Sequence, residues 1–257
     1  MNAATPEDGL ATRSKTGQQI RGYAVHVYTA SGVAFAFLAA AEVCQTVPNV
    51  TLVFLLLTCA VLIDATDGPL ARRWQVKRHA HRIDGRTIDD IVDYLTFTFI
   101  PLLLIWRMGW LPHPASAWVM PALIASLLGF ANTSAKDESG GYFLGFPSYW
   151  NIVAFYAGIW HRFFGPWPNA AMVLGLALLT VLPIRFIYPN LAPHPWRSTV
   201  IVGALAWLAV LLAMLRDYSS VSLSLALFSL IYPIFYTALS IYLAAGPMKR
   251  HDRLSSR

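Results

Sequence analysis

Eight long apolar stretches dominate the chain and limit what it can fold into. They lie at residues 23–44, 50–71, 87–107, 115–134, 148–165, 169–188, 198–215 and 220–245. A helix needs about 20 residues to cross the roughly 30 Å hydrocarbon core of a bilayer, and each stretch is close to that length. Only 12% of the residues are charged, against about 25% in an average soluble domain. The sequence therefore predicts an all-α polytopic membrane protein with about eight transmembrane helices.

The polar ends of the chain fall outside these stretches. We expect one transmembrane domain over residues 23–246, which would also carry any catalytic site. Residues 1–22 are expected to form an N-terminal tail or interfacial helix, and residues 247–257 a basic tail.

Positive charges gather on one side of the predicted spans. Sixteen of the 19 Lys and Arg residues lie in the N-terminal segment, the loops after even-numbered spans and the C-terminal segment, and three lie in the opposite loops. By the positive-inside rule, this bias predicts that both termini are cytoplasmic. The same topology, with attraction to anionic membrane lipids, accounts for the net charge of +6. We therefore expect no nucleic-acid partner.

Acidic residues cluster at the cytoplasmic border of spans two and three. Six of the 13 lie there: Asp64, Asp67, Asp84, Asp89, Asp90 and Asp93. At about 100° per residue, Asp64 and Asp67 share one face of the helix that ends span two. Asp89 and Asp93 share one face of span three, while Asp90 lies about 100° away from that face. Two neighbouring helices would thus direct four carboxylates towards one point.

Four facing carboxylates repel one another and lose hydration unless cations neutralise them. Mg²⁺ and Mn²⁺ prefer carboxylate oxygen, and two such ions about 3.5–4 Å apart form a clamp for phosphoryl transfer. Acids at membrane depth are rare and usually functional. We therefore predict Asp64, Asp67, Asp89 and Asp93 as ligands of two Mn²⁺ or Mg²⁺ ions. Asp90 is predicted to be a solvated or helix-terminal charge.

Small residues and an arginine accompany the acids. Gly68, Ala71 and Gly85 leave room for a nucleotide to approach the backbone, and Arg72 offers a planar fork to a phosphate. Helix packing uses the same small residues, and a positive-inside anchor uses the same arginine, so both interpretations stay open.

The order of these residues resembles a known signature. Asp64-x-x-Asp67-Gly68-x-x-Ala71-Arg72, followed by Gly85-x-x-x-Asp89-x-x-x-Asp93, is similar to the motif of the CDP-alcohol phosphotransferases. Twelve residues separate Arg72 from Gly85, a longer spacing than is usual in that family. This basic insertion is expected to alter the cytoplasmic rim.

The resemblance implies a fold and a chemistry. Members of the family cleave the pyrophosphate of a CDP-linked molecule, move the phospho-group to an alcohol and release CMP. The four aspartates would then hold two metal ions, and Asp93 would act as general base. Gly68, Ala71, Arg72 and Gly85 would line the nucleotide site. The resemblance also implies a six-helix core, with spans seven and eight as additions, and a homodimer.

Other segments resemble a subgroup of that family. AVHVYTASG at 24–32, FLGFPSYWN at 143–151 and LPIRFIYP at 182–189 are similar to the bacterial phosphatidylcholine synthases. This resemblance implies CDP-diacylglycerol as donor, choline as acceptor and a location in the bacterial inner membrane.

A quaternary ammonium group is held by aromatic faces, helped by an acid. Candidates for choline contact are Tyr94, Glu138, Tyr142, Phe146, Tyr149, Trp150 and Tyr188. Tyr and Trp also gather at membrane interfaces for other reasons. Serine, inositol or a glycerol phosphate remain alternative acceptors, and Arg185 and Arg197 are available to bind a phosphorylated one. A cation transporter is a more distant alternative, because the acids lie at the membrane edge and no internal repeat is visible.

Overall fold

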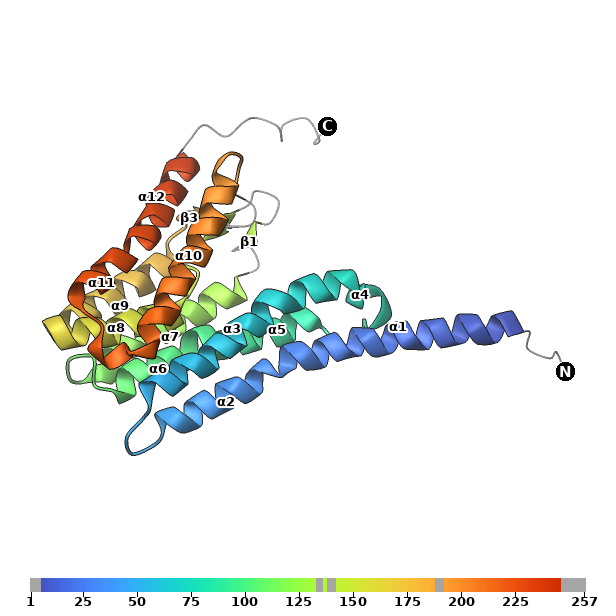
Figure 1. Cartoon of the computed structure of the whole chain (residues 1–257), viewed down its shortest axis with the longest axis horizontal. Helices are drawn as coiled ribbons and strands as arrows, with labels where there is room; N and C mark the ends of the chain where they lie inside the picture. The colour runs from blue at the N-terminus through green and yellow to red at the C-terminus, as the bar shows by residue number, and fades with distance from the viewer. Residues whose placement is uncertain (1–5, 133–135, 138–141, 188–191, 246–257) are drawn as a thin grey trace.

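Helices make up almost all of the protein (Figure 1). The computed structural model describes residues 6–132, 136–137, 142–187 and 192–245. The α-helices are α1 (Pro6–Ala30), α2 (Gly32–Val43), α3 (Val50–Arg73), α4 (Val76–His79), α5 (Gly85–Asp93), α6 (Ile100–Arg107), α7 (Ala115–Ala131), α8 (Trp150–Phe164), α9 (Pro166–Val181), α10 (Trp196–Arg216), α11 (Leu223–Ser229) and α12 (Ile231–Ala245). A π-helix, η1 (Tyr94–Phe99), links α5 to α6, and a 3₁₀-helix, η3 (Tyr218–Ser220), precedes α11.

The described residues place a helical segment on each of the eight predicted spans. Four helices are long and apolar enough to cross a membrane: Thr16–Val43, Val50–Arg73, Trp196–Arg216 and Leu223–Leu243. Ala115–Ala131 and Pro166–Val181 are shorter apolar helices. The continuous segment α5–η1–α6 covers span three, and α8 covers span five. The prediction of an all-α polytopic membrane protein is confirmed.

Prolines explain two departures from the predicted spans. Helix α9 ends at Val181 rather than at residue 188, because a residue that precedes proline disfavours helical geometry and Leu182 before Pro183 is extended. The eighth span divides at Leu230, because Pro233 has no N–H to donate to the Ser229 carbonyl.

The N-terminal segment is helical from Pro6 onwards. Residues 6–22 are helical and run without interruption into the first span, so α1 extends far from the bundle (Figure 1). The predicted C-terminal tail at 247–257 lies outside the described residues.

A small antiparallel sheet takes up the predicted end of span six and pairs it with residues that lie between spans four and five. Strands β1 (Lys136–Asp137), β2 (Tyr142–Leu144) and β3 (Arg185–Ile187) pair in the order β1-β2-β3. Phe143 of β2 lies opposite Phe186 of β3, and both are buried. Strands this short carry no visible alternation in the sequence, and their pairing joins segments that are far apart in the chain.

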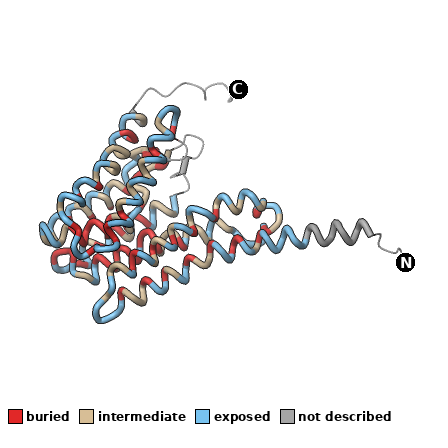
Figure 2. Tube along the Cα trace, in the orientation of Figure 1, coloured by how far each residue is buried: buried red, intermediate tan, exposed pale blue. Residues whose placement is uncertain are grey.

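Three separate apolar clusters are buried in the described residues, and the smallest of them joins α1 to α4. The largest cluster draws on α2, α3, α6–α9, α10 and α11, with Leu102, Trp150 and Ile159 fully buried in it. A smaller cluster joins β3, α10 and α12 around Ile187, Val200 and Leu239. Figure 2 shows buried residues along the inside of the bundle and exposed residues on its outer faces. Many of those exposed side chains are large and apolar, as expected for a surface that faces lipid.

Candidate active site

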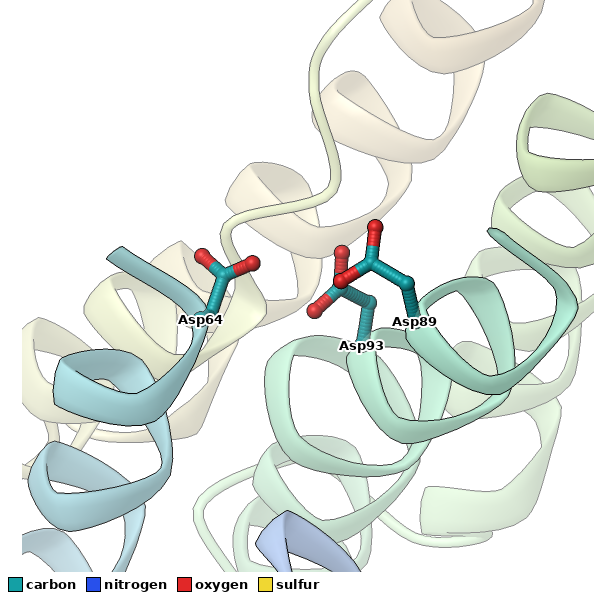
Figure 3. Close-up of side chains that lie close together, drawn as sticks. All are labelled: Asp64, Asp89 and Asp93. Carbon is teal, nitrogen blue, oxygen red and sulfur yellow. The ribbon is translucent and has the colours of Figure 1, made fainter. Parts of the chain in front are cut away.

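Three aspartates from two helices, α3 and α5, converge on one point. Asp64 of α3 faces Asp89 and Asp93 of α5 across a narrow gap (Figure 3). One carboxylate oxygen from each lies within 4.8 Å of the other two, and all three side chains are half-buried. Oxygen donors at this separation suit a hard divalent cation, so the group fits the metal that the sequence predicts.

Local capping positions the two aspartates of α5. Asp84 begins the helix, and its carboxylate accepts hydrogen bonds from the Arg86 N–H at 3.1 Å and the Thr87 hydroxyl at 2.8 Å. The hydrogen bond from Thr87, followed by that from Arg86, lowers the pKa of the Asp84 carboxyl below its ordinary value. This N-cap fixes the start of the helix, so Asp89 and Asp93 follow on successive turns of one face.

Asp67 and Asp90 lie outside the group of three. Asp67 follows Asp64 by one turn of α3, and its side chain is buried at 7% exposure. The structure therefore brings together three of the four predicted metal ligands. Asp90 lies 3.7 Å from Arg86, as part of an ion pair at the helix surface.

A π-helix begins directly after Asp93. Pro101 has no N–H for the Phe97 carbonyl, and its ring would clash with that carbonyl in a regular α-helix. The wider turn avoids this clash, and the Ile100 N–H bonds to the Leu95 carbonyl, five residues back. Insertions of this kind are frequent at functional sites.

A cavity of about 330 Å³ opens beside the three carboxylates. It is lined by Asp64, Asp89, Asp93, Phe97, Gly129, Phe130, Phe143, Leu144, Phe146, Pro147, Ser148, Tyr149 and Thr180. Five of these side chains are aromatic, and the rings of Phe97 and Tyr149 lie 5.9 Å apart. Among the described lining residues there are three acids and no Lys or Arg.

Two of the predicted choline contacts line this cavity, namely Phe146 and Tyr149. Trp150 does not: it is fully buried, and its indole N–H donates to the Ser126 hydroxyl at 2.7 Å. Its ring instead supports Phe146 edge-on at 5.5 Å.

Tyr94 and Tyr142 also lie away from the cavity lining. Tyr94 packs edge-on behind Phe130 at 5.9 Å. Tyr142 lies in β2 and packs against the Ile187 cluster. Glu138 and Tyr188 lie outside the described residues.

Sequence reasoning missed two of the lining aromatics, Phe97 and Phe130, whereas Phe143 is among the aromatic residues that residues 136–151 offer for choline contact. Phe97 had a signal, because it follows Asp93 by four residues and so shares its face. Phe143 begins the FLGFPSYWN segment. Nothing in the sequence around Phe130 indicates a place in the site, because it reaches the cavity only through the packing of α7 on α9 and η1.

The predicted nucleotide residues lie around the ends of α3 and α5. A Cβ at Gly68 would lie 3.5 Å from Nη1 of Arg72, so the guanidinium folds back over Gly68. At Gly85, a Cβ would lie 2.9 Å from Cε1 of His26. Gly85 therefore allows α5 to pack tightly on α1, as expected for a small residue used in helix packing. Ala71 packs against the cluster of α1 and α4 described next.

The basic insertion between Arg72 and Gly85 forms α4 and docks on α1. Val25, Val76 and Ala80 are buried together there. Gly22 allows this approach, because its Cβ would lie 2.9 Å from that of Ala80. The insertion therefore braces α1 against the turn that leads into α5.

The membrane-spanning helical fold, the ordered signature and the three converging aspartates together define a CDP-alcohol phosphotransferase. No model of a known protein family matches the chain. Several individual proteins are nevertheless similar to it in sequence. The phosphatidylcholine synthase of Pseudomonas aeruginosa is 40% identical over 170 residues, which cover 66% of this chain and 69% of that protein. The Mesorhizobium japonicum phosphatidylcholine synthase is 32% identical over 89% of this chain and 86% of its own length.

A third phosphatidylcholine synthase, from Borreliella burgdorferi, is 29% identical over 87% of this chain and 94% of its own length. The chain belongs to the phosphatidylcholine synthase family.

Proposed function

We propose that the protein transfers the phosphatidyl group of CDP-diacylglycerol to choline, giving phosphatidylcholine and CMP. The names of the relatives support this reaction. The observation that carries it is the cavity, which joins three carboxylates to five aromatic side chains and has no basic residue among its described lining. That composition favours a cationic acceptor over a phosphorylated one.

The aspartates are proposed to hold two Mn²⁺ or Mg²⁺ ions, with Asp64, Asp89 and Asp93 as the converging ligands and Asp67 as the fourth. Such ions would neutralise the pyrophosphate and stabilise the charge that develops on departing CMP. Arg72, Gly68, Ala71 and Gly85 are proposed to receive the nucleotide. The fold of Arg72 over Gly68 supports this, because it places a guanidinium one turn from the carboxylate group.

Asp93 is the proposed general base. Its carboxylate would accept the hydroxyl proton of choline as the choline oxygen bonds to the phosphatidyl phosphorus. The phosphoanhydride bond to CMP breaks in the same displacement, and its electron pair leaves with CMP. The position of Asp93 supports this role, since it contributes to the carboxylate group and also lines the cavity.

The quaternary ammonium is proposed to lie among Phe97, Phe130, Phe143, Phe146 and Tyr149. Aromatic faces attract a cation without needing a hydrogen-bond donor on it, which a trimethylated nitrogen lacks. Phe146 and Tyr149 retain the role predicted from the sequence, and Trp150 is assigned a supporting one.

We further propose a bacterial inner-membrane location with both termini and the active site cytoplasmic. The excess of Lys and Arg in one set of loops supports this orientation. A homodimer is proposed from the family resemblance alone, and the mass of the detergent-solubilised protein measured by light scattering tests it.

The function is tested by CMP release from CDP-diacylglycerol with purified protein. Choline, serine, inositol and glycerol 3-phosphate are compared as acceptors under identical conditions with Mn²⁺. We expect turnover with choline only. Turnover with a different alcohol alone would refute choline as acceptor and leave the aspartate chemistry standing.

Replacing Phe97 with leucine should weaken choline binding while preserving apolar bulk. Because a cation–π contact contributes about 0.5–2 kcal/mol, the KM for choline should rise about 2- to 30-fold. The KM for CDP-diacylglycerol should stay within about two-fold of wild type, since the lipid donor makes no cation–π contact. Steady-state kinetics with each substrate varied in turn measures both values.

Phe99→Leu is the matched control, because Phe99 lies in the same π-helix but is exposed and does not line the cavity. A neutral analogue of choline, 3,3-dimethylbutan-1-ol, separates charge from size. Equal effects of Phe97→Leu on choline and on this analogue would remove the cation–π contact from the proposal.

A further inference from the structure

Helix α12 holds both backbone groups of one residue in β3. The Tyr236 hydroxyl donates a hydrogen bond to the Ile187 carbonyl oxygen, and the Ile187 N–H donates to the Ser240 hydroxyl at 3.4 Å. Tyr236 and Ser240 lie one turn apart on α12. Because β3 is the last strand in the order β1-β2-β3, these two side chains take the place of a further strand. Ile187 is only 1% exposed, so its backbone groups need such partners.

Strand β3 in turn holds the wall of the acceptor cavity. Phe143 pairs with Phe186 in the ladder, and Leu144 pairs with Arg185. One residue beyond the strand, the Gly145 N–H donates to the Ile184 carbonyl at 2.7 Å. Phe143, Leu144 and the following Phe146 all line the cavity. The contacts therefore run without a gap from α12 through β3 and β2 to the proposed choline site.

Glycine is required at the end of this wall. Gly145 has a φ of +82°, and a Cβ there would lie 2.3 Å from the Thr180 carbonyl oxygen. The Phe146 N–H also donates to the Leu179 carbonyl at 3.1 Å, at the end of α9. The wall is thus fastened to α9 on one side and, through β3, to α12 on the other.

Among the described residues, α10 and α11 also pack on α3 and α8 in the main core, but the direct link from the last span to the cavity wall runs through Ile187. Ile187, Val200 and Leu239 belong to the smaller apolar cluster, separate from the main core. No described residue of α10, α11 or α12 lines the cavity. Figure 1 shows α10 and α12 side by side next to β3, away from α1 and α2.

We propose that Tyr236 and Ser240 are positioning residues through which the last two spans set the affinity for the acceptor alcohol. They hold Ile187, and hence the β2–β3 wall, at the distance at which Phe143 and Phe146 contact the acceptor. The inference rests on the proposed function in one respect, namely that the alcohol occupies this cavity.

The test compares Tyr236→Phe with Tyr232→Phe. The Tyr232 hydroxyl donates to the Val200 carbonyl at 2.9 Å, so its removal costs α12 a similar hydrogen bond to α10 without touching β3. For Tyr236→Phe we expect the choline KM to rise about five-fold, the factor that one net hydrogen bond represents. The kcat and the KM for CDP-diacylglycerol should stay within about two-fold of wild type, because the carboxylates and the nucleotide site are unmoved. Tyr232→Phe should leave all three constants near wild type.

Hydrogen exchange of residues 142–149 gives a readout that does not depend on turnover. The segment should exchange faster in Tyr236→Phe and in Ser240→Ala than in wild type or Tyr232→Phe, because its backbone opens more often. Equal exchange and equal choline KM in Tyr236→Phe and Tyr232→Phe would overturn the proposal. If Tyr236→Phe does not fold, the same comparison with Ser240→Ala decides it. If the wild type uses a different alcohol, choline is refuted as acceptor, and the KM for that alcohol then tests the positioning role.

Discussion

Asp93→Asn should reduce CMP release from CDP-diacylglycerol by about 100- to 10,000-fold, the range that a general base contributes. The amide keeps the size of the side chain but cannot accept the choline proton at neutral pH. It also removes one charge from the group in which Asp64, Asp89 and Asp93 lie within 4.8 Å. The loss should appear in kcat, because the proton is transferred only in the reaction step. Single-turnover and steady-state assays with choline at saturating concentration measure it.

Asp90→Asn is the matched control on the same helix. Asp90 neighbours the site in sequence but pairs with Arg86 at 3.7 Å and does not line the cavity. Its removal should change kcat by no more than about five-fold, since an ion pair at the surface contributes about 0–1 kcal/mol. Near-normal turnover in Asp93→Asn, or equal losses in the two variants, would show that Asp93 is not the base.

Chelation should abolish activity, and Mn²⁺ or Mg²⁺ should restore it. Without a cation, three half-buried carboxylates face one another, and the pyrophosphate of the donor would add further negative charge. Metal should also stabilise the fold in the absence of substrate. At about 100 times its Kd, a ligand that binds only the folded state adds about 2.7 kcal/mol to the free energy of unfolding. Thermal unfolding after EDTA treatment, with and without added Mn²⁺, measures this shift in Tm.

Asp64→Asn ties the metal effect to this site. Removing one of three converging ligands should raise the Mn²⁺ concentration needed for half-maximal activity and reduce the Mn²⁺-induced rise in Tm. Thr66→Val, two residues along α3, is a useful control, because its hydroxyl bonds to the Leu62 carbonyl and to the Tyr28 hydroxyl and does not belong to the carboxylate group. Full activity of the wild type in EDTA would exclude the metal mechanism, and an unchanged Mn²⁺ response in Asp64→Asn would exclude this location.

Helical periodicity predicted most of the carboxylate group. Asp89 and Asp93 are four residues apart, so any helix through them places both on one face, and the structure finds both with Asp64. Asp67 shows the limit of that reasoning. Three residues turn a helix by about 300°, so the side chain of Asp67 points about 60° away from that of Asp64. In the packed structure Asp67 is buried and lies outside the group of three carboxylates.

The aromatic cavity was only half predictable. Phe146 and Tyr149 were found because a cation-binding site calls for aromatic side chains, and both line it. Trp150 has the same chemistry and the same neighbourhood in sequence, but α8 turns it into the core, where Ser126 accepts its N–H. Residue type identifies candidates, whereas the backbone direction after Gly145 decides which of them face the cavity.

The sequence by itself determined the membrane-spanning class, the eight helical segments and the faces of the acidic residues. Each of these depends on local quantities, namely the length of an apolar run and the angle between nearby residues on a helix. Two features appear only in the tertiary structure. One is the pairing of the three short strands, and the other is the attachment of the cavity wall to α12 through Ile187. Ile187 meets Tyr236 and Ser240 across about 50 residues of chain, through hydrogen bonds at separations of 49 and 53 residues. No local pattern encodes such a pairing, because it exists only when α10 and α12 have packed and left one strand edge to be satisfied.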